Sequence, residues 1–272
     1  MIKYKRLEWT SEQVSKFWDY ESKFPENYFS KQVGNNLAAY IKNSFPDKKT
    51  VLDFGCGPGF LMEYLIEKDF QVAGLEFSKE SLQIVNQKLS GNPNFSGAFE
   101  FDSLISQHLK FDIITLVEVI EHLNDFILNS TFMNIKKLLS DDGVLIITTP
   151  NNEDIEKSMV YCPNCDSIFH RWQHLRSWSL YSLSEYLISN KFSLVKVFTT
   201  DIGRILSVQE NISEPIYISS FYKRVRTYVY RLLKHTLNYF NSNVSNAEPP
   251  IISYNEPHLV AVVQLVKEVC VE

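Results

Sequence analysis

The chain has 272 residues and a formal net charge of −5 at neutral pH, so no overall positive field favours nucleic acid. Its length and 44% hydrophobic content are sufficient for one large domain or for a domain with a sizeable insertion. No run of about 18 apolar residues could span a membrane, and the N-terminus lacks the apolar core of a secretory signal. Four cysteines without the spacing of a disulfide framework lead us to expect a cytoplasmic protein.

In chain order, an aromatic-rich helical segment precedes an alternation of short apolar strands and helices. The helical segment is predicted over 11–44, within an N-terminal unit of residues 1–46 that we expect to cover a ligand pocket. Strands are predicted at 51–55, 71–76, 96–101, 111–117, 144–149, 192–199 and 259–266. Helices are predicted at 59–68, 79–89, 125–139 and 179–190. This alternation is typical of parallel β-α-β units and predicts an α/β fold.

The most informative sequence is Val-Leu-Asp-Phe-Gly-Cys-Gly-Pro-Gly at 51–59, followed seventeen residues later by Glu76. The apolar residues ending in Asp53 predict a buried strand, and the glycines allow a sharp turn whose backbone N–H groups can approach a ligand. Glu76 ends the next strand, where a carboxylate can bind the hydroxyls of a nucleotide ribose. The third glycine of a dinucleotide-binding fingerprint would fall at Phe60, so the motif is a different one.

This pattern resembles motif I of the class I S-adenosylmethionine-dependent methyltransferases, and the resemblance covers about 50–200 and 259–267. It implies S-adenosylmethionine as the cofactor and a Rossmann-like sheet of seven mostly parallel strands, with helices on both faces and an antiparallel last strand. The cofactor-binding domain would comprise 47–200 and 259–272. Two insertions would interrupt this domain. One contains cysteines and histidines and comprises 151–178, after the fifth strand. The other is helical and comprises 201–258, before the last strand.

The resemblance also assigns binding roles to the strand ends. The methionine part of the cofactor would be held by Asp53, Gly55, Cys56, Gly57 and Gly59. Glu76 would bind the ribose hydroxyls, with Phe77 against the adenine. Asp102 would accept a hydrogen bond from the adenine amino group, with Ser103 beside it.

The run from Glu118 through Glu121 to His122 begins where the fourth strand ends and should face the mouth of the pocket. In a helical turn these three residues share one face, where they can form a base with an orienting partner or bind a divalent cation. The run resembles the ubiquinone-pathway O-methyltransferases. It also resembles the methyltransferases of small-RNA ends, in which E-x-x-E-H and a later histidine, here His174, hold a metal. In other family members the same run makes only local contacts.

Cys162 and Cys165 form a C-x2-C pair, and His170 and His174 follow it with a C-x2-C-x4-H-x3-H spacing. A proline within C-x-x-C favours a turn that points both sulfurs at one ion, and two thiolates with two imidazoles satisfy tetrahedral Zn²⁺. We therefore predict a structural zinc site that holds the 151–178 insertion. The alternative is two free thiols beside two unrelated histidines. His174 can serve only one of the two metal hypotheses.

A helical stripe of apolar residues runs from 218 to 240 in the second insertion. Its other face is basic, with Lys223, Arg224, Arg226, Arg231 and Lys234. We interpret the segment as a helix packed over the sheet edge. The alternatives are a lid over an anionic acceptor and, for 216–240, peripheral contact with the inner face of a membrane.

These observations predict an S-adenosylmethionine-dependent methyltransferase, with transfer to an oxygen atom of a small-molecule, glycan or lipid-linked acceptor. One alternative is metal-dependent 2′-O-methylation of an RNA 3′-terminal ribose. Its weakness is that the only clear basic patch is one helical segment, whereas proteins that bind single strands normally have a positive groove along the strand. Another alternative is a methyltransferase-like binding module without activity.

Overall fold

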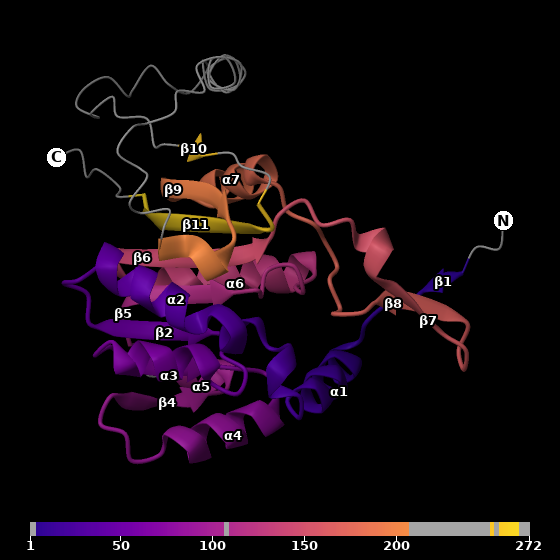
Figure 1. The fold of residues 1–272 in the computed structure, drawn as a ribbon, viewed down its shortest axis with the longest axis horizontal. Coiled ribbons are helices and arrows are strands. Elements are labelled where there is room, and N and C mark those ends of the chain that lie inside the picture. Colours follow the sequence, from indigo (N-terminus) through magenta and orange to yellow (C-terminus); the bar gives the residue numbers. More distant parts are fainter. Residues whose placement is uncertain (1–3, 106–108, 207–250, 253–255, 267–272) are drawn as a thin grey trace.

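The computed structural model describes residues 4–105, 109–206, 251–252 and 256–266 (Figure 1). The apolar stripe at 216–240 and its predicted roles as a lid or membrane contact lie outside these residues. Within the described residues, no helix is both long and apolar enough to cross a bilayer.

One mixed sheet forms the centre of the molecule, with strand order β10-β9-β11-β6-β5-β2-β3-β4. Its strands are β2 (Thr50–Phe54), β3 (Gln71–Leu75), β4 (Phe95–Phe99), β5 (Phe111–Val117), β6 (Leu139–Pro150), β9 (Phe192–Thr200), β10 (Ile251–Ile252) and β11 (His258–Leu265). β11 runs antiparallel to both of its neighbours, β6 and β9. The predicted seven-stranded sheet with an antiparallel last strand is therefore confirmed. The two-residue β10 adds an eighth strand parallel to β9.

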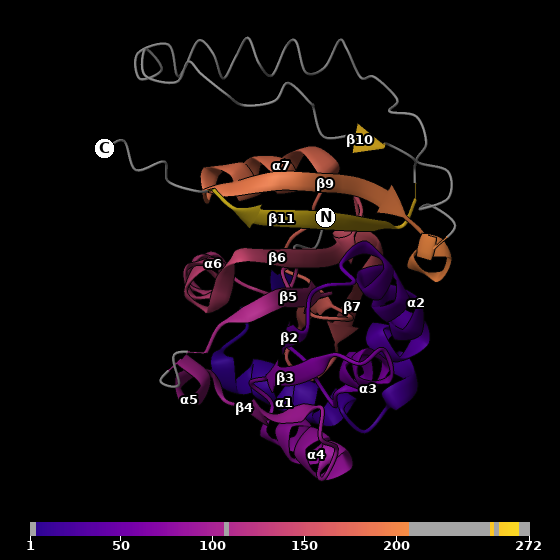
Figure 2. The ribbon, with the colours of Figure 1, turned by 90° about the vertical axis from the view of Figure 1, so that its left-hand side faces the viewer.

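Helices cover both faces of this sheet, with α2 and α3 on one side and α5 and α6 on the other (Figure 2). The helices are α1 (Ser11–Glu21), α2 (Phe29–Ser44), α3 (Phe60–Glu67), α4 (Lys79–Leu89), α5 (Phe101–Ile105), α6 (Asp125–Leu138) and α7 (Leu180–Ser189). The predicted helix over 11–44 is two helices, because the chain turns through the short 3₁₀ helix η1 (Pro25–Asn27), which begins at a proline. α5 was not predicted, since its five residues are too few for a helical period.

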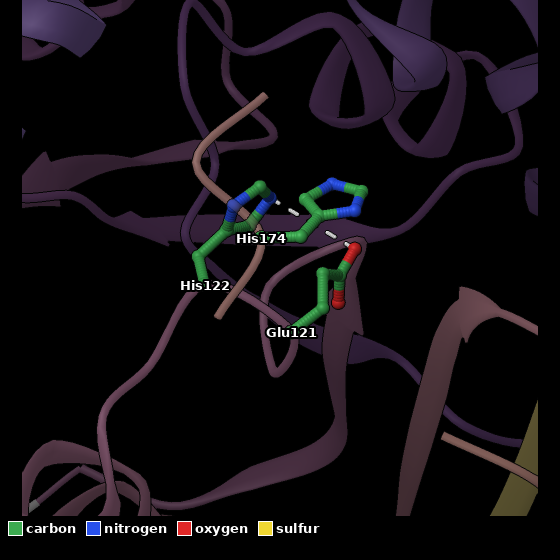
Figure 3. A group of neighbouring side chains, drawn as sticks. All are labelled: Glu121, His122 and His174. Atoms are coloured by element: carbon green, nitrogen blue, oxygen red, sulfur yellow. Dashed lines mark ion pairs between the residues drawn. The ribbon is translucent and has the colours of Figure 1, made fainter. Parts of the chain in front are cut away.

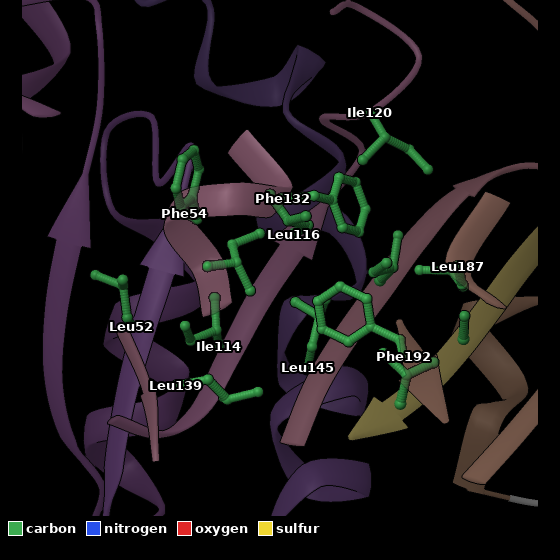
Figure 4. Close-up of a cluster of buried hydrophobic side chains, with 14 of the residues drawn as sticks. Leu52, Phe54, Ile114, Leu116, Ile120, Phe132, Leu139, Leu145, Leu187 and Phe192 are labelled. Carbon is green, nitrogen blue, oxygen red and sulfur yellow. The ribbon is translucent and has the colours of Figure 1, made fainter. Parts of the chain in front are cut away.

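Alternate residues of the central strands enter two separate hydrophobic cores. In β5, Ile114 and Leu116 pack with Phe132 of α6 in the core shown in Figure 4, whereas Ile113 packs on the other face with Leu61 of α3. Because both faces are buried, these strands read as continuous apolar runs, which is typical of parallel sheets. The carboxyl ends of β2, β3, β5 and β6 consequently meet at one edge, where the candidate site lies.

The insertion after β6 contains a hairpin that projects from the main sheet (Figure 1). A 3₁₀ turn, η2 (Ile155–Ser158), precedes the antiparallel strands β7 (Met159–Cys162) and β8 (Ser167–His170). The N-terminal strand β1 (Lys5–Arg6) pairs parallel to β8 and completes a three-stranded sheet. The N-terminal segment and the insertion, far apart in sequence, therefore lie side by side. In the second insertion, the described residues include a third 3₁₀ turn, η3 (Ile202–Arg204).

Candidate functional site

The glycine loop connects β2 to α3 in a conformation that favours glycine at three positions. Gly55, Gly57 and Gly59 have φ angles of 81°, 51° and 80°, in the left-handed region that residues with a Cβ rarely adopt. A Cβ on Gly55 would lie 2.8 Å from a side-chain methyl of Val119, so the loop directly abuts the turn that follows β5.

Cys56 shapes this loop, and its role in cofactor binding stays a prediction. Its backbone N–H donates to the Leu75 carbonyl at 3.0 Å. Its sulfur packs beneath the loop, since a Cβ on Gly74 would lie only 2.7 Å from that sulfur. Burial raises the pKa of the Cys56 thiol well above its ordinary value, which argues against a role as nucleophile.

Glu76 and the glycine loop meet as the sequence predicts. One carboxylate oxygen of Glu76 accepts the Gly57 N–H at 2.9 Å, and the other accepts the N–H groups of Phe77 at 2.6 Å and Ser78 at 2.8 Å. Burial raises the pKa of this carboxyl, and the three N–H donors oppose that rise. The Phe77 side chain is exposed beside the site. Asp102 and Ser103 lie on the first turn of α5, and their role in binding adenine stays a prediction.

Asp53 is the penultimate residue of β2, just before the loop, and is almost fully buried. The Thr115 hydroxyl donates to its carboxyl at 2.8 Å. Burial is the main reason why the pKa of Asp53 is raised to about 7, against the lowering effect of Thr115 and with a smaller raising effect of Glu76.

This raised pKa should make the stability of the ligand-free protein depend on pH. Because the folded pKa lies above the unfolded one, the stabilising contribution of Asp53 is complete below about pH 4 and is lost as the pH rises through 7. Asp53→Asn should therefore reduce the fall in melting temperature between pH 5 and 8 by on the order of 5 °C. Thermal unfolding over this range would measure the effect, with the exposed Asp47→Asn as the control. An equal pH dependence in the wild type and Asp53→Asn would contradict it.

The N-terminal segment lies against both the glycine loop, which is the cofactor half of the site, and the turn after β5, which is the acceptor half. The Ser78 hydroxyl donates to Asp19 of α1 at 2.7 Å, and the ring of Tyr28 lies 3.0 Å from where a Cβ on Gly57 would be. Trp18 of α1 packs edge-on against the His122 ring, with 5.0 Å between the ring centroids. α1 and Tyr28 therefore bridge the glycine loop and the turn after β5.

The turn after β5 directs its polar side chains toward the end of β6. Glu118 accepts a hydrogen bond from the Thr148 hydroxyl at 2.8 Å, and Glu121 accepts one from the Thr149 hydroxyl at 2.9 Å. The run forms a turn and no helix, with Glu118 at a φ of 52°. The expectation of one shared helical face is therefore corrected.

Burial controls the charge of these groups. Burial raises the pKa of Glu118 to about 7, with a further rise from Glu153, and raises that of Glu121 well above its ordinary value, with a further rise from Glu118. Burial is also the main reason why the pKa of His122 is lowered to about 3, so its imidazole is neutral. One carboxyl oxygen of Glu121 and Nδ1 of His122 are buried without a hydrogen-bond partner in the described part of the chain.

His174 joins this group from the insertion (Figure 3). One ligand atom each from Glu121, His122 and His174 lie within 4.8 Å of one another, and the rings of His122 and His174 have centroids 4.7 Å apart. The Leu175 N–H donates to the Glu121 carbonyl at 2.8 Å, and the Gln173 side chain donates to the His122 carbonyl at 3.2 Å. The proximity of His174 to the E-x-x-E-H run, which was implied by the alternative resemblance to the small-RNA methyltransferases, is therefore present in the structure.

The four predicted zinc ligands do not come together. Cys162 pairs with Ser167 next to the hairpin turn, whereas His170 pairs with Met159 at the other end of β7. The Cys162 and His170 positions are three residues apart along the hairpin, which corresponds to about 10 Å because a strand rises about 3.3 Å per residue. Among the described residues, neither group with metal-ligand spacing contains a cysteine. The prediction of one C-x2-C-x4-H-x3-H zinc site is wrong, because the intervening residues form a hairpin strand.

Loss of one hairpin thiol should consequently change little. Cys165 is exposed, so Cys165→Ser should leave the melting temperature within about 2 °C of the wild type and the metal content of the purified protein unchanged. Thermal unfolding and elemental mass spectrometry would measure both. A drop of more than about 5 °C together with loss of bound zinc would restore the zinc hypothesis.

Glu153, which was not predicted from the sequence, lies against both histidines of the insertion. Its carboxylate lies 3.2 Å from Nε2 of His170 and 2.5 Å from Nδ1 of His174. Burial works against ionisation of Glu153, but the contacts with His174 and His170 hold its pKa below the ordinary value. Its position three residues after β6 was the available signal, because the carboxyl end of β6 lies at the same edge of the sheet as Glu76.

Three features together are typical of the class I S-adenosylmethionine-dependent methyltransferases. They are an open, mostly parallel sheet with an antiparallel last strand, a glycine loop after the first strand of that sheet, and an acidic residue after the second strand. A family model described as a methyltransferase domain matches residues 27–197. The chain belongs to this methyltransferase-domain family.

Curated relatives agree with this assignment. The ubiquinone biosynthesis O-methyltransferase of Pelagibacter ubique (strain HTCC1062) is 28% identical over 163 residues, covering 55% of this chain and 66% of the relative. The enzyme of the same name from Glaesserella parasuis serovar 5 (strain SH0165) is 33% identical over 111 residues, covering 38% of this chain and 46% of the relative. The chain thus spans about half to two thirds of the length of these relatives.

Solved structures share the fold at low sequence identity. A DhpI complex with S-adenosylhomocysteine has a TM-score of 0.56 at 12% identity and covers 94% of this chain and 97% of that one. The 1,6-didemethyltoxoflavin N1-methyltransferase of Burkholderia thailandensis also has a TM-score of 0.56 at 12% identity, with 98% and 95% covered. At these identities the likeness shows the Rossmann-like methyltransferase fold alone.

Proposed function

We propose that the protein transfers the methyl group of S-adenosylmethionine to an oxygen atom of a small-molecule acceptor. The observation that carries this proposal is the adjacency of two sites. The carboxylate of Glu76 binds the glycine loop through the Gly57 N–H, and the same loop abuts Val119 in the turn that bears Glu121 and His122. One side has the groups that bind a nucleoside, and the other has the polar groups that receive an acceptor.

The residues of the cofactor half suit S-adenosylmethionine. Glu76 offers carboxylate oxygens to the ribose hydroxyls, in place of its present bond to Gly57, and charge-assisted bonds of this kind are strong. Asp53 and the glycine loop lie where the methionine part would bind. When bound, S-adenosylmethionine supplies an electrophilic methyl group for an in-line displacement. The protein then needs mainly to align donor and acceptor and to exclude water.

An oxygen acceptor is favoured because an alcohol or phenol is a poor nucleophile until its proton is removed. The imidazole of His174, whose ring lies beside that of His122, is a group that can accept such a proton. The curated relatives are named as O-methyltransferases. Ring contacts of Trp18 with His122 and Phe17 form an aromatic wall beside these groups, against which a flat acceptor could pack.

The alternative of metal-dependent methylation at an RNA 3′ end has one observation in its favour. Glu121, His122 and His174 have the spacing that a divalent cation needs, and one Glu121 oxygen lacks a partner among the described residues. Cys162, Cys165 and the hairpin that carries them give no support to this alternative.

Methyl transfer from S-[methyl-³H]adenosylmethionine would test the proposal. The full chain would be incubated with catechols, phenols, glycosides and a polyprenol-linked sugar, and separately with a single-stranded RNA and Mn²⁺. Label in a small hydroxyl compound without added metal supports the proposal. Label only in the RNA, and only with Mn²⁺, would favour the alternative. S-adenosylmethionine binding without transfer to any acceptor would favour a binding module.

A further inference from the structure

Glu153 is a carboxylate between two imidazoles, and this arrangement fixes where their protons lie. Nδ1 of His170 accepts the backbone N–H groups of Trp172 at 3.2 Å and His174 at 3.1 Å. A neutral imidazole has one acceptor nitrogen, so the proton of His170 must be on Nε2, which faces Glu153. The protonated Nε2 of this histidine therefore lies 3.2 Å from one oxygen of Glu153, as an electrostatic contact without hydrogen-bond geometry.

The other oxygen of Glu153 determines the tautomer of His174. It lies 2.5 Å from Nδ1 of His174, and an ionised carboxylate can only accept hydrogen bonds. The neutral form of the His174 imidazole therefore has its proton on Nδ1 and its lone pair on Nε2. The two stacked rings, with centroids 4.4 Å apart and an 18° interplanar angle, thus carry opposite tautomers.

Left-handed backbone conformations occur beside these residues. Six non-glycine residues in the described part of the chain have left-handed φ angles, and three of them border the site. Asn152 immediately precedes Glu153, Gln173 immediately precedes His174, and Glu118 begins the turn after β5. Backbone strain of this kind persists where surrounding structure enforces it and gathers at functional sites.

Buried contacts enforce the conformation of Gln173. Its side chain accepts the indole N–H of Trp18 at 3.1 Å and donates to the His122 carbonyl at 3.2 Å. His174 is therefore held next to His122 on one side and against Glu153 on the other. This is the arrangement of an oriented imidazole base, in which a carboxylate binds one nitrogen and leaves the second for the substrate.

We infer that Glu153 is the positioning residue of the site and that it presents Nε2 of His174 as the proton acceptor for a hydroxyl substrate, an alcohol or a phenol. This inference rests on the proposed methyl transfer. The acceptor O–H proton moves to Nε2 as the new O–C bond forms. The C–S bond of the sulfonium breaks, and its electron pair stays on sulfur, which leaves as a neutral thioether. His174 becomes an imidazolium beside the Glu153 carboxylate.

Histidine NMR tests the positioning role without any acceptor. In full-length protein labelled with ¹⁵N-histidine, long-range ¹H–¹⁵N spectra distinguish the two tautomers, and His174→Gln assigns the signals. We expect His174 protonated on Nδ1 and His170 on Nε2. Glu153→Gln should shift His174 toward protonation on Nε2, whereas the exposed Glu156→Gln should leave it unchanged. His174 protonated on Nε2 in the wild type would overturn the inference.

Kinetics tests the catalytic consequence. With a weakly acidic phenol, Glu153→Gln should lower kcat by about 10- to 100-fold and leave KM for S-adenosylmethionine within about twofold. With a nitrophenol of similar shape, whose hydroxyl is already ionised, the loss should be much smaller. Equal losses for both phenols would overturn the base role. Wild-type protein that binds no S-adenosylmethionine would overturn the proposed function itself, while the tautomer result would still stand.

Discussion

Replacing Glu76 by alanine should weaken the binding of S-adenosylmethionine by about 10- to 150-fold. A hydrogen bond to a charged group contributes roughly 1.5–3 kcal/mol, and 1.4 kcal/mol corresponds to a factor of ten. Glu76 also accepts the N–H groups of Gly57, Phe77 and Ser78, so its removal leaves the glycine loop without the carboxylate that links it to β3. The lost ribose contact and the loosened glycine loop both weaken cofactor binding.

Isothermal titration calorimetry would measure this loss. Glu80→Ala is the matched control, because Glu80 is an exposed acid in the first turn of α4, four residues further along the chain. It should bind with wild-type affinity. An affinity of Glu76→Ala within a factor of about two of the wild type would mean that Glu76 has no ribose-binding role.

Gly55→Ala should damage both halves of the site at once. Its φ of 81° costs a residue with a Cβ roughly 1–2 kcal/mol, and the new Cβ would lie 2.8 Å from Val119, where overpacking typically costs 1–3 kcal/mol more. We therefore expect a loss of about 2–5 kcal/mol in stability. Cofactor affinity should also fall at least about tenfold, because the branched Val119 side chain has little rotamer freedom with which to yield.

Gly91 provides a matched control for the backbone effect. It has the same left-handed conformation, with φ of 82°, but a Cβ there would contact nothing within 4 Å. Gly91→Ala should cost only roughly 1–2 kcal/mol of stability and leave cofactor affinity unchanged. Chemical denaturation and calorimetry on the two variants separate the contributions. Equal behaviour of the two variants would refute the role assigned to contact between the glycine loop and Val119.

The cofactor half of the site could be predicted from sequence because local rules determine it. Buried parallel strands have continuous apolar runs, so β2 and β3 were visible, and their last residues bring Glu76 and the glycine loop to one edge. The left-handed turns at Gly55, Gly57 and Gly59 leave a direct mark in the sequence, since other residues adopt them at a cost.

The acceptor half depends on long-range contacts that leave little local signal. The C-x2-C-x4-H-x3-H spacing suits a metal only if the intervening chain bends back, and here it extends as β8. The proximity of Glu153 to His170 and His174 depends on how the insertion packs against the turn after β5. Left-handed Asn152 and Gln173 could not be foreseen either, because these residue types occur in every backbone region.

A crystal structure of the full chain with bound S-adenosylhomocysteine would test the central claim most directly. We expect the ribose hydroxyls within hydrogen-bonding distance of the Glu76 carboxylate. The thioether sulfur should face the space between Glu121, His122 and His174. S-adenosylhomocysteine bound elsewhere, or with its sulfur directed away from these three residues, would contradict the account.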